Sequence, residues 1–208
     1  MDALSFVLDS TTGSTVNRVF LKCNSETEKQ AFFFSYAAFA TLGKTSPLSG
    51  SNYIFVVARV VELLRIHGFP PEVLAATWLY KVFVYTPANL ASGLSIFEPI
   101  VAEMVKSLAP VNISICPSKR ARRSEECRFL LNSSGDCKSI KCAELLINCS
   151  LMKMRSISAA NRYQTENTVL LSSLEGASPV LFEAVTSMMR TNAAVDNLIR
   201  YVRYVKPD

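Results

Sequence analysis

The stretch from residue 70 to residue 86, PPEVLAATWLYKVFVYT, constrains the fold more than any other part of the chain. Two prolines open it, and proline suits the first turn of a helix because that turn needs no amide donor. The residues that follow are apolar on nearly every side, as in a helix that is buried all round. Lys81 is an exception, and it needs a partner because an unpaired buried charge is very costly. The sequence therefore predicts a buried central helix that carries a paired lysine.

The composition indicates a compact, mostly helical protein. Half of the 208 residues are apolar, and glycine and proline are sparse. The net charge of +5 permits an anionic partner such as a nucleotide, but drift of surface residues gives the same value. No apolar run approaches the roughly 20 residues that span a bilayer. The N-terminus has an acid at Asp2 and no basic region of a secretory signal. We therefore expect an intracellular protein, cytoplasmic or nuclear and not secreted.

Cysteine and histidine give no sign of a metal site. The chain has six cysteines, none in a C-x-x-C pair, and a single histidine, His67. A zinc site generally needs two close pairs of ligands. An intracellular protein keeps its cysteines reduced, and they are then best read as small buried hydrophobic side chains.

The remaining pattern predicts an irregular N-terminal arm followed by helices. Residues 1–24 form the expected arm, with a short strand at residues 18–22. A single helical domain is expected over residues 25–208, with divergent C-terminal helices over 156–208. Residues 156–178 read as a loop or broken helix, and Ser178 and Pro179 begin an amphipathic last helix. Earlier helices are expected near residues 26–42, 53–66, 70–86, 95–108 and 138–152.

Two segments resemble the RelA/SpoT-type HD hydrolase domain in its small MESH1-like form. The family's central helix reads A-A-L-L-H-D-V-V-E-D-T, and LAATWLYKVFVYT aligns with it without gaps. Its His-Asp pair then falls on Tyr80 and Lys81, and its Glu-Asp pair falls on Val84 and Tyr85. The family motif K-x-I-K-x-A-D-K-L-x-N-L resembles KSIKCAELLINC, and its metal-binding Asp falls on Glu144.

A third segment carries a weaker part of the same resemblance. The family's first metal-binding His falls on Thr41, or on Leu42 if the loop gap is placed differently. The motif S-G-x-x-Y-I is kept at residues 49–54, and the further His behind it corresponds to Val56. Of the basic residues usual in this loop, only Lys44 remains.

The resemblance implies an all-α fold, the HD-domain helical bundle of the RelA/SpoT hydrolase type. It also implies a manganese-dependent phosphohydrolase that acts on guanosine 3′,5′-bis(diphosphate) or on NADPH. Such a metal is held by imidazoles and carboxylates, and it activates the attacking water. The positions that would hold it, which we interpret as a degenerate metal site, are Thr41, Tyr80, Lys81 and Glu144. The degenerate catalytic pair is Val84 and Tyr85.

These substitutions predict a catalytically inactive pseudo-hydrolase that acts by binding or assembly and uses no cofactor. Lys81 and Glu144 stand where two metal-binding carboxylates would stand, so we expect an ion pair between them in the vacated metal position. Two alternatives are an active or residual phosphohydrolase and a metal-free nucleotide sensor. The sensor would use Lys44, Lys141 and Asn148 to contact phosphates and ribose.

A basic cluster after residue 117 allows three interpretations. It could be a solvated loop leading into a helix, a nuclear-import signal, or a phosphate-binding segment like the basic segment of the related family. The partner could be a protein, a nucleotide or a second copy of the chain, whereas we expect neither a membrane nor a nucleic acid. The cluster comprises Lys119, Arg120, Arg122 and Arg123.

Overall fold

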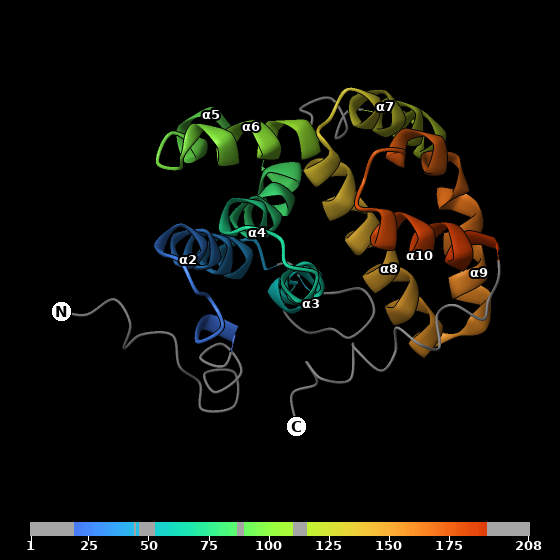
Figure 1. The fold of residues 1–208 in the computed structure, drawn as a ribbon, viewed down its shortest axis with the longest axis horizontal. Coiled ribbons are helices and arrows are strands. Elements are labelled where there is room, and N and C mark those ends of the chain that lie inside the picture. Colours follow the sequence, from blue (N-terminus) through green and yellow to red (C-terminus); the bar gives the residue numbers. More distant parts are fainter. Residues whose placement is uncertain (1–18, 44, 46–52, 87–89, 110–115, 191–208) are drawn as a thin grey trace.

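The computed structural model describes residues 19–43, 45, 53–86, 90–109 and 116–190, and within them the chain is helical (Figure 1). The all-α class expected from the sequence is confirmed. Its elements are α2 (Glu26–Thr41), α3 (Ile54–Ile66), α4 (Pro71–Tyr85), α5 (Leu90–Leu94), α6 (Pro99–Leu108), α7 (Lys119–Leu131), α8 (Gly135–Arg155), α9 (Ile157–Asn167), the 3-10 helix η3 (Thr168–Leu174) and α10 (Pro179–Arg190).

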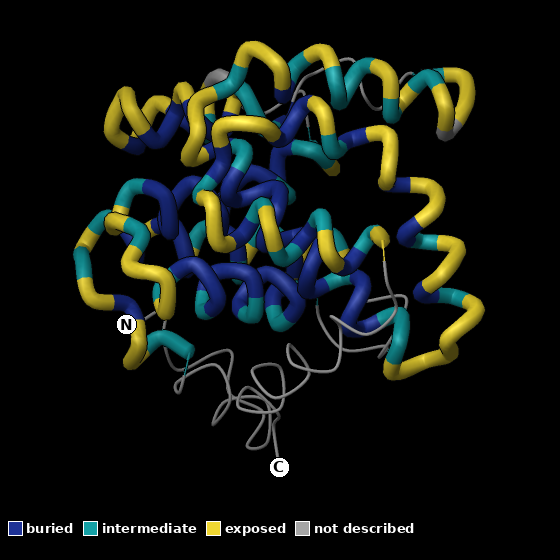
Figure 2. The backbone as a smooth tube through the Cα atoms, turned by 45° about the vertical axis from the view of Figure 1, so that its right-hand side comes forward, coloured by how far each residue is buried: buried dark blue, intermediate teal, exposed yellow. Residues whose placement is uncertain are grey.

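Helix α4 lies at the centre of the first half of the fold, as its all-round apolar sequence predicts. It packs against α2, α3, α6 and α8. Trp78, Leu79 and Phe83 are each at most 1% exposed, and Figure 2 shows the buried backbone concentrated at the centre of the bundle. The long helix α8 joins this half to the second half, where α9, η3 and α10 pack against it. The two halves therefore meet chiefly where α3 packs against α8, with smaller contacts from α4 and α6.

The ends of the main helices follow local signals in the sequence. Pro70 is extended and Pro71 takes the first position of α4, while the hydroxyl of Thr86 donates to the carbonyl of Val82 at 2.9 Å where α4 ends. Ser25 begins α2 because its hydroxyl accepts the amide of Glu28 at 3.1 Å.

Two predictions about local structure are wrong. Residues 19–22 form a helical turn rather than a strand, with the amide of Lys22 bonded to the carbonyl of Val19 at 3.2 Å. The turn places the ring of Phe20 4.9 Å from that of Phe33, and this packing outweighs the loose alternation of the sequence. The helix expected at 95–108 begins only at Pro99, and residues 90–94 form the separate short helix α5.

The C-terminal part fits the broken-helix interpretation. Helix α9 passes into η3 over the stretch that was expected to be a loop or a broken helix. Helix α10 begins at Pro179, and Leu181, Val185 and Met188 face the core as its amphipathic pattern predicts. Residues 191–208 lie outside the described part. The division into an arm over 1–24 and a domain over 25–208 stays a prediction.

A buried carboxylate fastens α2, α3 and α4 together. Glu28 of α2 is 1% exposed, and Arg65 of α3 contacts both of its oxygens, at 2.5 and 3.1 Å. The indole nitrogen of Trp78 in α4 donates to the same carboxylate at 3.2 Å. Because a buried charge must be compensated, these contacts fix how the three helices meet.

Replacing Arg65 should therefore destabilise the bundle. We expect Arg65→Met to lower the free energy of unfolding by about 3–5 kcal/mol, because it leaves the buried Glu28 carboxylate with neutral donors, the Trp78 indole and the backbone amide of Asn24, in place of the guanidinium. Urea unfolding followed by circular dichroism measures this loss. Arg128→Met is the matched control, since Arg128 and Glu125 form an exposed pair that typically contributes about 0–1 kcal/mol. Equal losses in the two variants would contradict the account.

Candidate functional site

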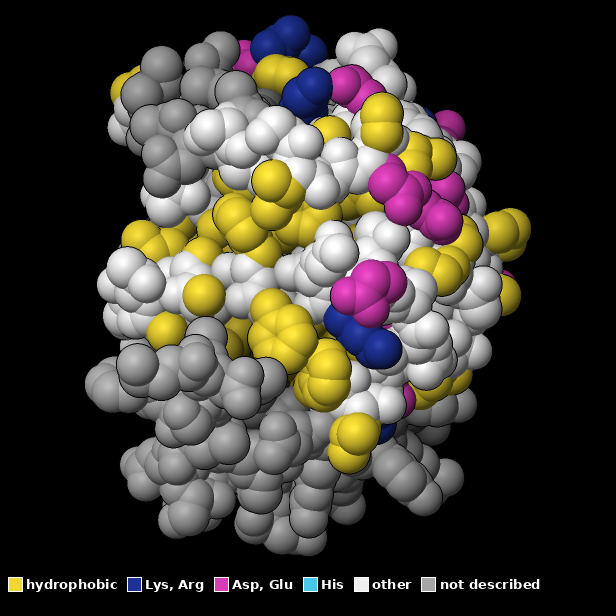
Figure 3. Space-filling view, turned by 90° about the vertical axis from the view of Figure 1, so that its left-hand side faces the viewer, with side chains coloured by type: hydrophobic (Ala, Val, Ile, Leu, Met, Phe, Trp, Pro, Cys, Tyr) yellow, Lys and Arg dark blue, Asp and Glu magenta, His cyan; other side chains and the backbone are white. Residues whose placement is uncertain are grey.

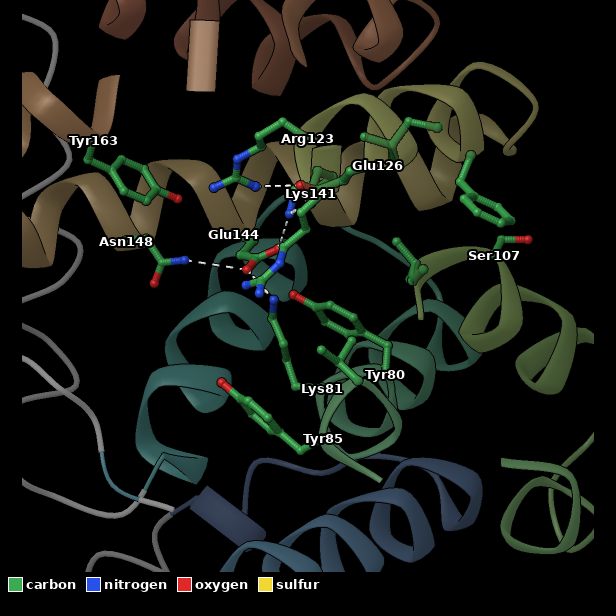
Figure 4. Close-up of a pocket in the computed structure, with 15 residues that line it drawn as sticks. Tyr80, Lys81, Tyr85, Ser107, Arg123, Glu126, Lys141, Glu144, Asn148 and Tyr163 are labelled. Atoms are coloured by element: carbon green, nitrogen blue, oxygen red, sulfur yellow. Dashed lines mark hydrogen bonds and ion pairs between the residues drawn. The ribbon is translucent and has the colours of Figure 1, made fainter. Parts of the chain in front are cut away.

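A cavity of about 230 Å³ opens between α4, α6, α7, α8 and α9 (Figure 4). Its lining combines charged side chains with tyrosines, and it includes several of the positions singled out in the sequence. The described residues that line it are Tyr80, Lys81, Val84, Tyr85, Ser107, Leu108, Arg122, Arg123, Glu126, Phe129, Leu130, Lys141, Glu144, Asn148 and Tyr163.

Glu144 lies at the centre of the charged side chains in this cavity. Its Oε1 is 2.5 Å from Nζ of Lys81, which reaches it from α4. Its Oε2 accepts a hydrogen bond of 2.8 Å from Nζ of Lys141, one turn earlier on α8. Asn148 also donates to Oε1, at 3.4 Å. Each oxygen of this largely buried carboxylate is therefore bound to an ammonium group.

The ionic contacts continue from α8 to α7. Lys141 also pairs with Glu126, and Glu126 pairs in turn with Arg123. Two of the contacts, Lys141–Glu144 and Arg123–Glu126, join residues three apart on one helix, which brings their side chains to the same face. We call these four residues together with Lys81 the charge network. It contains three cations and two carboxylates, so its net charge is +1.

The network sets the protonation states of its own carboxylates. Burial alone would raise the pKa of Glu144, but Lys141 and Lys81 together hold that pKa well below its ordinary value. For Glu126, Lys141 and Arg123 outweigh burial and the neighbouring Glu144 carboxylate in the same way, so its pKa is also lowered. Both carboxylates are therefore ionised at neutral pH, and neither is a general acid there.

Tyrosines form the rest of the polar lining. The Nζ of Lys81 lies 5.0 Å from the centre of the Tyr80 ring, within the range of a cation–π contact. Burial and the Glu144 carboxylate raise the pKa of Tyr80 well above its ordinary value, and the pKa of Tyr163 rises for the same two reasons. These phenols stay protonated at neutral pH, so they can donate hydrogen bonds but cannot act as bases.

The donor set does not fit a manganese ion. Such an ion needs several carboxylate or imidazole ligands that are free to bind it. The chain's single histidine, His67, lies at the C-terminal end of α3. Among the described residues, no three His, Cys, Asp or Glu side chains are grouped as metal ligands would be. Glu144 has the ammonium of Lys81 at 2.5 Å, where a metal ion would have to approach.

The cavity brings together most of the residues singled out from the sequence. Those that line it are Tyr80, Lys81, Val84, Tyr85, Lys141, Glu144 and Asn148. Val56 borders a smaller neighbouring hollow that Lys81 and Glu144 also line. Thr41 is not among the lining residues, because it lies exposed in the last turn of α2 and donates its hydroxyl to the carbonyl of Ala37. Lys44 lies outside the described residues.

The basic cluster lies on a helix rather than in a loop. Helix α7 begins at Lys119 because the hydroxyl of Ser118 accepts the amide of Ala121 at 3.1 Å. Arg120 and Arg122 are exposed, whereas Arg123 turns into the cavity and joins the charge network. The solvated-loop interpretation is therefore wrong for these residues, while nuclear import stays a prediction.

Sequence reasoning missed Glu126 and Tyr163 and gave Arg123 a different role. The spacing Arg-x-x-Glu at residues 123–126 is a local signal of a paired charge on one helix face, and it repeats as Lys-x-x-Glu at residues 141–144. No comparable signal marks Tyr163, because its place in the cavity depends on how α9 packs against α8.

Comparison with known proteins supports the fold assignment. No protein-family model matches the chain, and no curated protein matches it. A solved structure described as a metazoan orthologue of SpoT that hydrolyses ppGpp and takes part in starvation responses superposes with a TM-score of 0.68. The match covers 82% of this chain and 97% of that chain at 19% identity. This chain thus has the all-helical fold of that MESH1-type HD domain.

None of the described helices is both long enough and apolar enough to cross a bilayer.

The two lysines of the network should differ in their effect on stability. Lys141→Met leaves Glu126 and Glu144 facing each other with one cation each, so we expect a loss of about 3–5 kcal/mol in unfolding free energy. Lys81→Met leaves Glu144 bonded to Lys141, so the expected loss is about 1.5–3 kcal/mol. Lys106→Met, which removes an exposed pair with Glu103, is the control. An equal loss for Lys81→Met and Lys141→Met would contradict the assigned contacts.

A double-mutant cycle isolates the contact between Lys81 and Glu144. We expect Lys81→Met combined with Glu144→Leu to be more stable than the sum of the single losses implies, with a coupling of about 0.5–3 kcal/mol. Chemical denaturation of the four proteins gives this value. Additive losses would show that the two side chains do not interact.

The lowered pKa values predict acid sensitivity. A carboxylate whose pKa is lowered by folding stabilises the protein above its ordinary pKa, 4.5 for Glu144 and Glu126, and that stabilisation is lost as pH falls through the folded value. We expect the unfolding free energy to fall below about pH 4.5, with each carboxylate steepening the slope by up to about 1.4 kcal/mol per pH unit. Urea unfolding from pH 6 to pH 2.5 should be less pH-dependent in Glu144→Gln. An unchanged slope would refute the assignment.

Proposed function

We propose that this chain is a non-catalytic, metal-free protein of the MESH1-type HD fold that acts by binding or assembly. The observation that supports it is the Glu144 carboxylate, whose two oxygens are bound by Lys81 and Lys141. A carboxylate held in this way has no oxygen free for a metal ion. The fold of a ppGpp hydrolase is thus combined with a site whose charges are already balanced by side chains.

The rest of the expected catalytic machinery is replaced as well. In the resembling family, a manganese ion supplies the attacking hydroxide by lowering the pKa of its bound water. Tyr80 and Lys81 stand at the positions of a metal-binding His-Asp pair, and Val84 and Tyr85 stand at those of the Glu-Asp pair. A protonated tyrosine, an ammonium and a valine offer no ligand for the metal and no base for the water.

A metal-free nucleotide sensor is the second candidate, because the cavity is lined by four cations and only two carboxylates. The residues expected to contact phosphate do not favour it. Lys141 is bound to two carboxylates, and Asn148 donates to Glu144. Arg122 is exposed at the cavity and has no ion pair with the described residues, so an anion would have to bind chiefly through it.

Turnover assays test the proposal. With manganese added, we expect the purified chain to hydrolyse neither guanosine tetraphosphate nor NADPH above the rate of a protein-free control. Turnover that depends on manganese and disappears in Glu144→Ala, but persists in Glu125→Ala, would overturn it. Glu125 is the matched control because its carboxylate pairs with Arg128 at the surface.

Calorimetry separates binding by the cavity from action through another surface. The sensor predicts that nucleotides bind to the wild-type chain and that Arg122→Gln weakens this binding. Absence of heat at millimolar nucleotide removes the sensor and leaves action through a protein partner.

A further inference from the structure

An open groove of about 820 Å³ lies between α7 and η3. Arg120, Arg122 and Arg123 of α7 line one side of it, and Val169 of η3 lines the other. The two elements pack against each other, and the thiol of Cys127 donates to the carbonyl of Val169 at 3.5 Å. We call this hollow the α7–η3 groove. It is distinct from the cavity around the charge network, although Arg122 and Arg123 line both.

The groove has an excess of positive charge. Besides the three arginines, its described lining contains one charged side chain, the carboxylate of Glu166, so its net charge is +2. Arg120 and Arg122 are exposed, and neither forms an ion pair with a described residue. Arg123 is held by Glu126, and this contact fixes the direction of its guanidinium group. The groove therefore offers two unpaired cations beside a third that is already oriented.

The spacing along α7 places these cations next to an apolar strip. Arg120, Arg123 and Cys127 are three and four residues apart, so they lie on one face of the helix. Across the groove, the side chain of Val169 is 56% exposed. An apolar side chain that packs on Val169 thus lies close to guanidinium groups, which bind carboxylates through two parallel hydrogen bonds.

This basic strip is a local feature of the surface. Four of the chain's 22 lysines and arginines fall within residues 119–123. On the side of the molecule formed by α2 and α5, shown in Figure 3, hydrophobic side chains gather and basic side chains are sparse. A confined positive charge beside an apolar strip suits a short ligand that is both acidic and apolar.

The charges favour an acidic peptide over a nucleic acid. Nucleic acids are bound mainly by lysines and arginines that neutralise several phosphates in a row. Among the described residues of the groove, only α7 supplies cations, and Glu166 of α9 would repel a chain of phosphates. A peptide can instead direct its carboxylates to α7 and its apolar side chains to η3.

We propose that the α7–η3 groove binds an acidic segment of a partner protein. Carboxylates of the segment pair with Arg120 and Arg122, and an apolar side chain next to them packs on Val169. The inference names a class of partner for a chain that acts by binding, and to that extent it rests on the function proposed above. Its test measures the binding of peptides rather than the hydrolysis of nucleotides, so its failure would leave the proposed lack of catalysis standing.

Fluorescence anisotropy with two pools of labelled peptides tests the proposal. The acidic pool contains short peptides of random sequence built from Asp, Glu, Val and Leu, and the neutral pool has Asn and Gln in place of Asp and Glu. We expect the full-length chain to bind the acidic pool at least about fivefold more tightly, because each pair of carboxylate and exposed guanidinium adds modestly to the affinity.

Two matched pairs of variants locate the site. Val169→Glu adds a carboxylate to the groove, so it should weaken binding of the acidic pool at least about fivefold. Ser107→Glu adds the same charge to the cavity alone and should leave the affinity unchanged. Arg120→Gln, at an exposed position of the groove, should also weaken binding, whereas Arg155→Gln at the exposed end of α8 should not. This second pair provides the comparison if circular dichroism shows that Val169→Glu is unfolded.

Three results would overturn the proposal. The first is equal binding of the two pools, or no binding of either at millimolar protein. The second is a loss in the groove variants that is no larger than in Ser107→Glu and Arg155→Gln, because the peptide would then lie elsewhere. The third is tighter binding of polyuridylate that displaces the acidic pool, because the groove would then be a nucleic-acid site.

Discussion

The two ammonium groups bound to the Glu144 carboxylate explain the chemistry of the whole cavity. A buried carboxylate is costly unless it is paired and hydrogen-bonded, and here both conditions are met by Lys81 from α4 and Lys141 from its own helix. The same contacts lower the pKa of Glu144 and keep it ionised. The two ammonium groups thus compensate the buried negative charge of Glu144, as a bound metal cation would.

The bundle supports this arrangement from two directions. Helix α4 is buried on most of its surface, and the contacts of Glu28 help to fix it against α2 and α3. The fixed position of α4 directs the side chain of Lys81 toward Glu144. On the other side, Glu126 of α7 holds Lys141 while Arg123 balances Glu126. Positive and negative side chains thus alternate through α4, α8 and α7, and each buried charge of the network has a partner of opposite sign.

Much of the fold and several residues of the cavity could be predicted from the sequence. The features that could not be predicted depend on how helices distant in the sequence pack together. The apolar run of α4 and the lone Lys81 within it predict both the buried helix and the need for a partner, and the second motif supplies that partner in Glu144. Lys141 was assigned to phosphate only in the alternative of a nucleotide sensor. Its bridge between two carboxylates could not be predicted, because its surroundings depend on where α7 packs. Thr41 lies away from the cavity lining, and its alignment crossed a loop whose gap the sequence leaves undetermined. The helical turn at residues 19–22 depends on rings of α2 that are distant in sequence.

Direct titration with manganese tests the central claim, that side chains rather than a metal ion balance the charge of Glu144. Free Mn²⁺ can be followed by electron paramagnetic resonance as it is added to the wild-type chain and to Glu144→Ala. The account predicts no specific binding at millimolar metal in either protein. Stoichiometric binding to the wild-type chain that is lost in Glu144→Ala would contradict it, because the carboxylate would then be available to a metal ion.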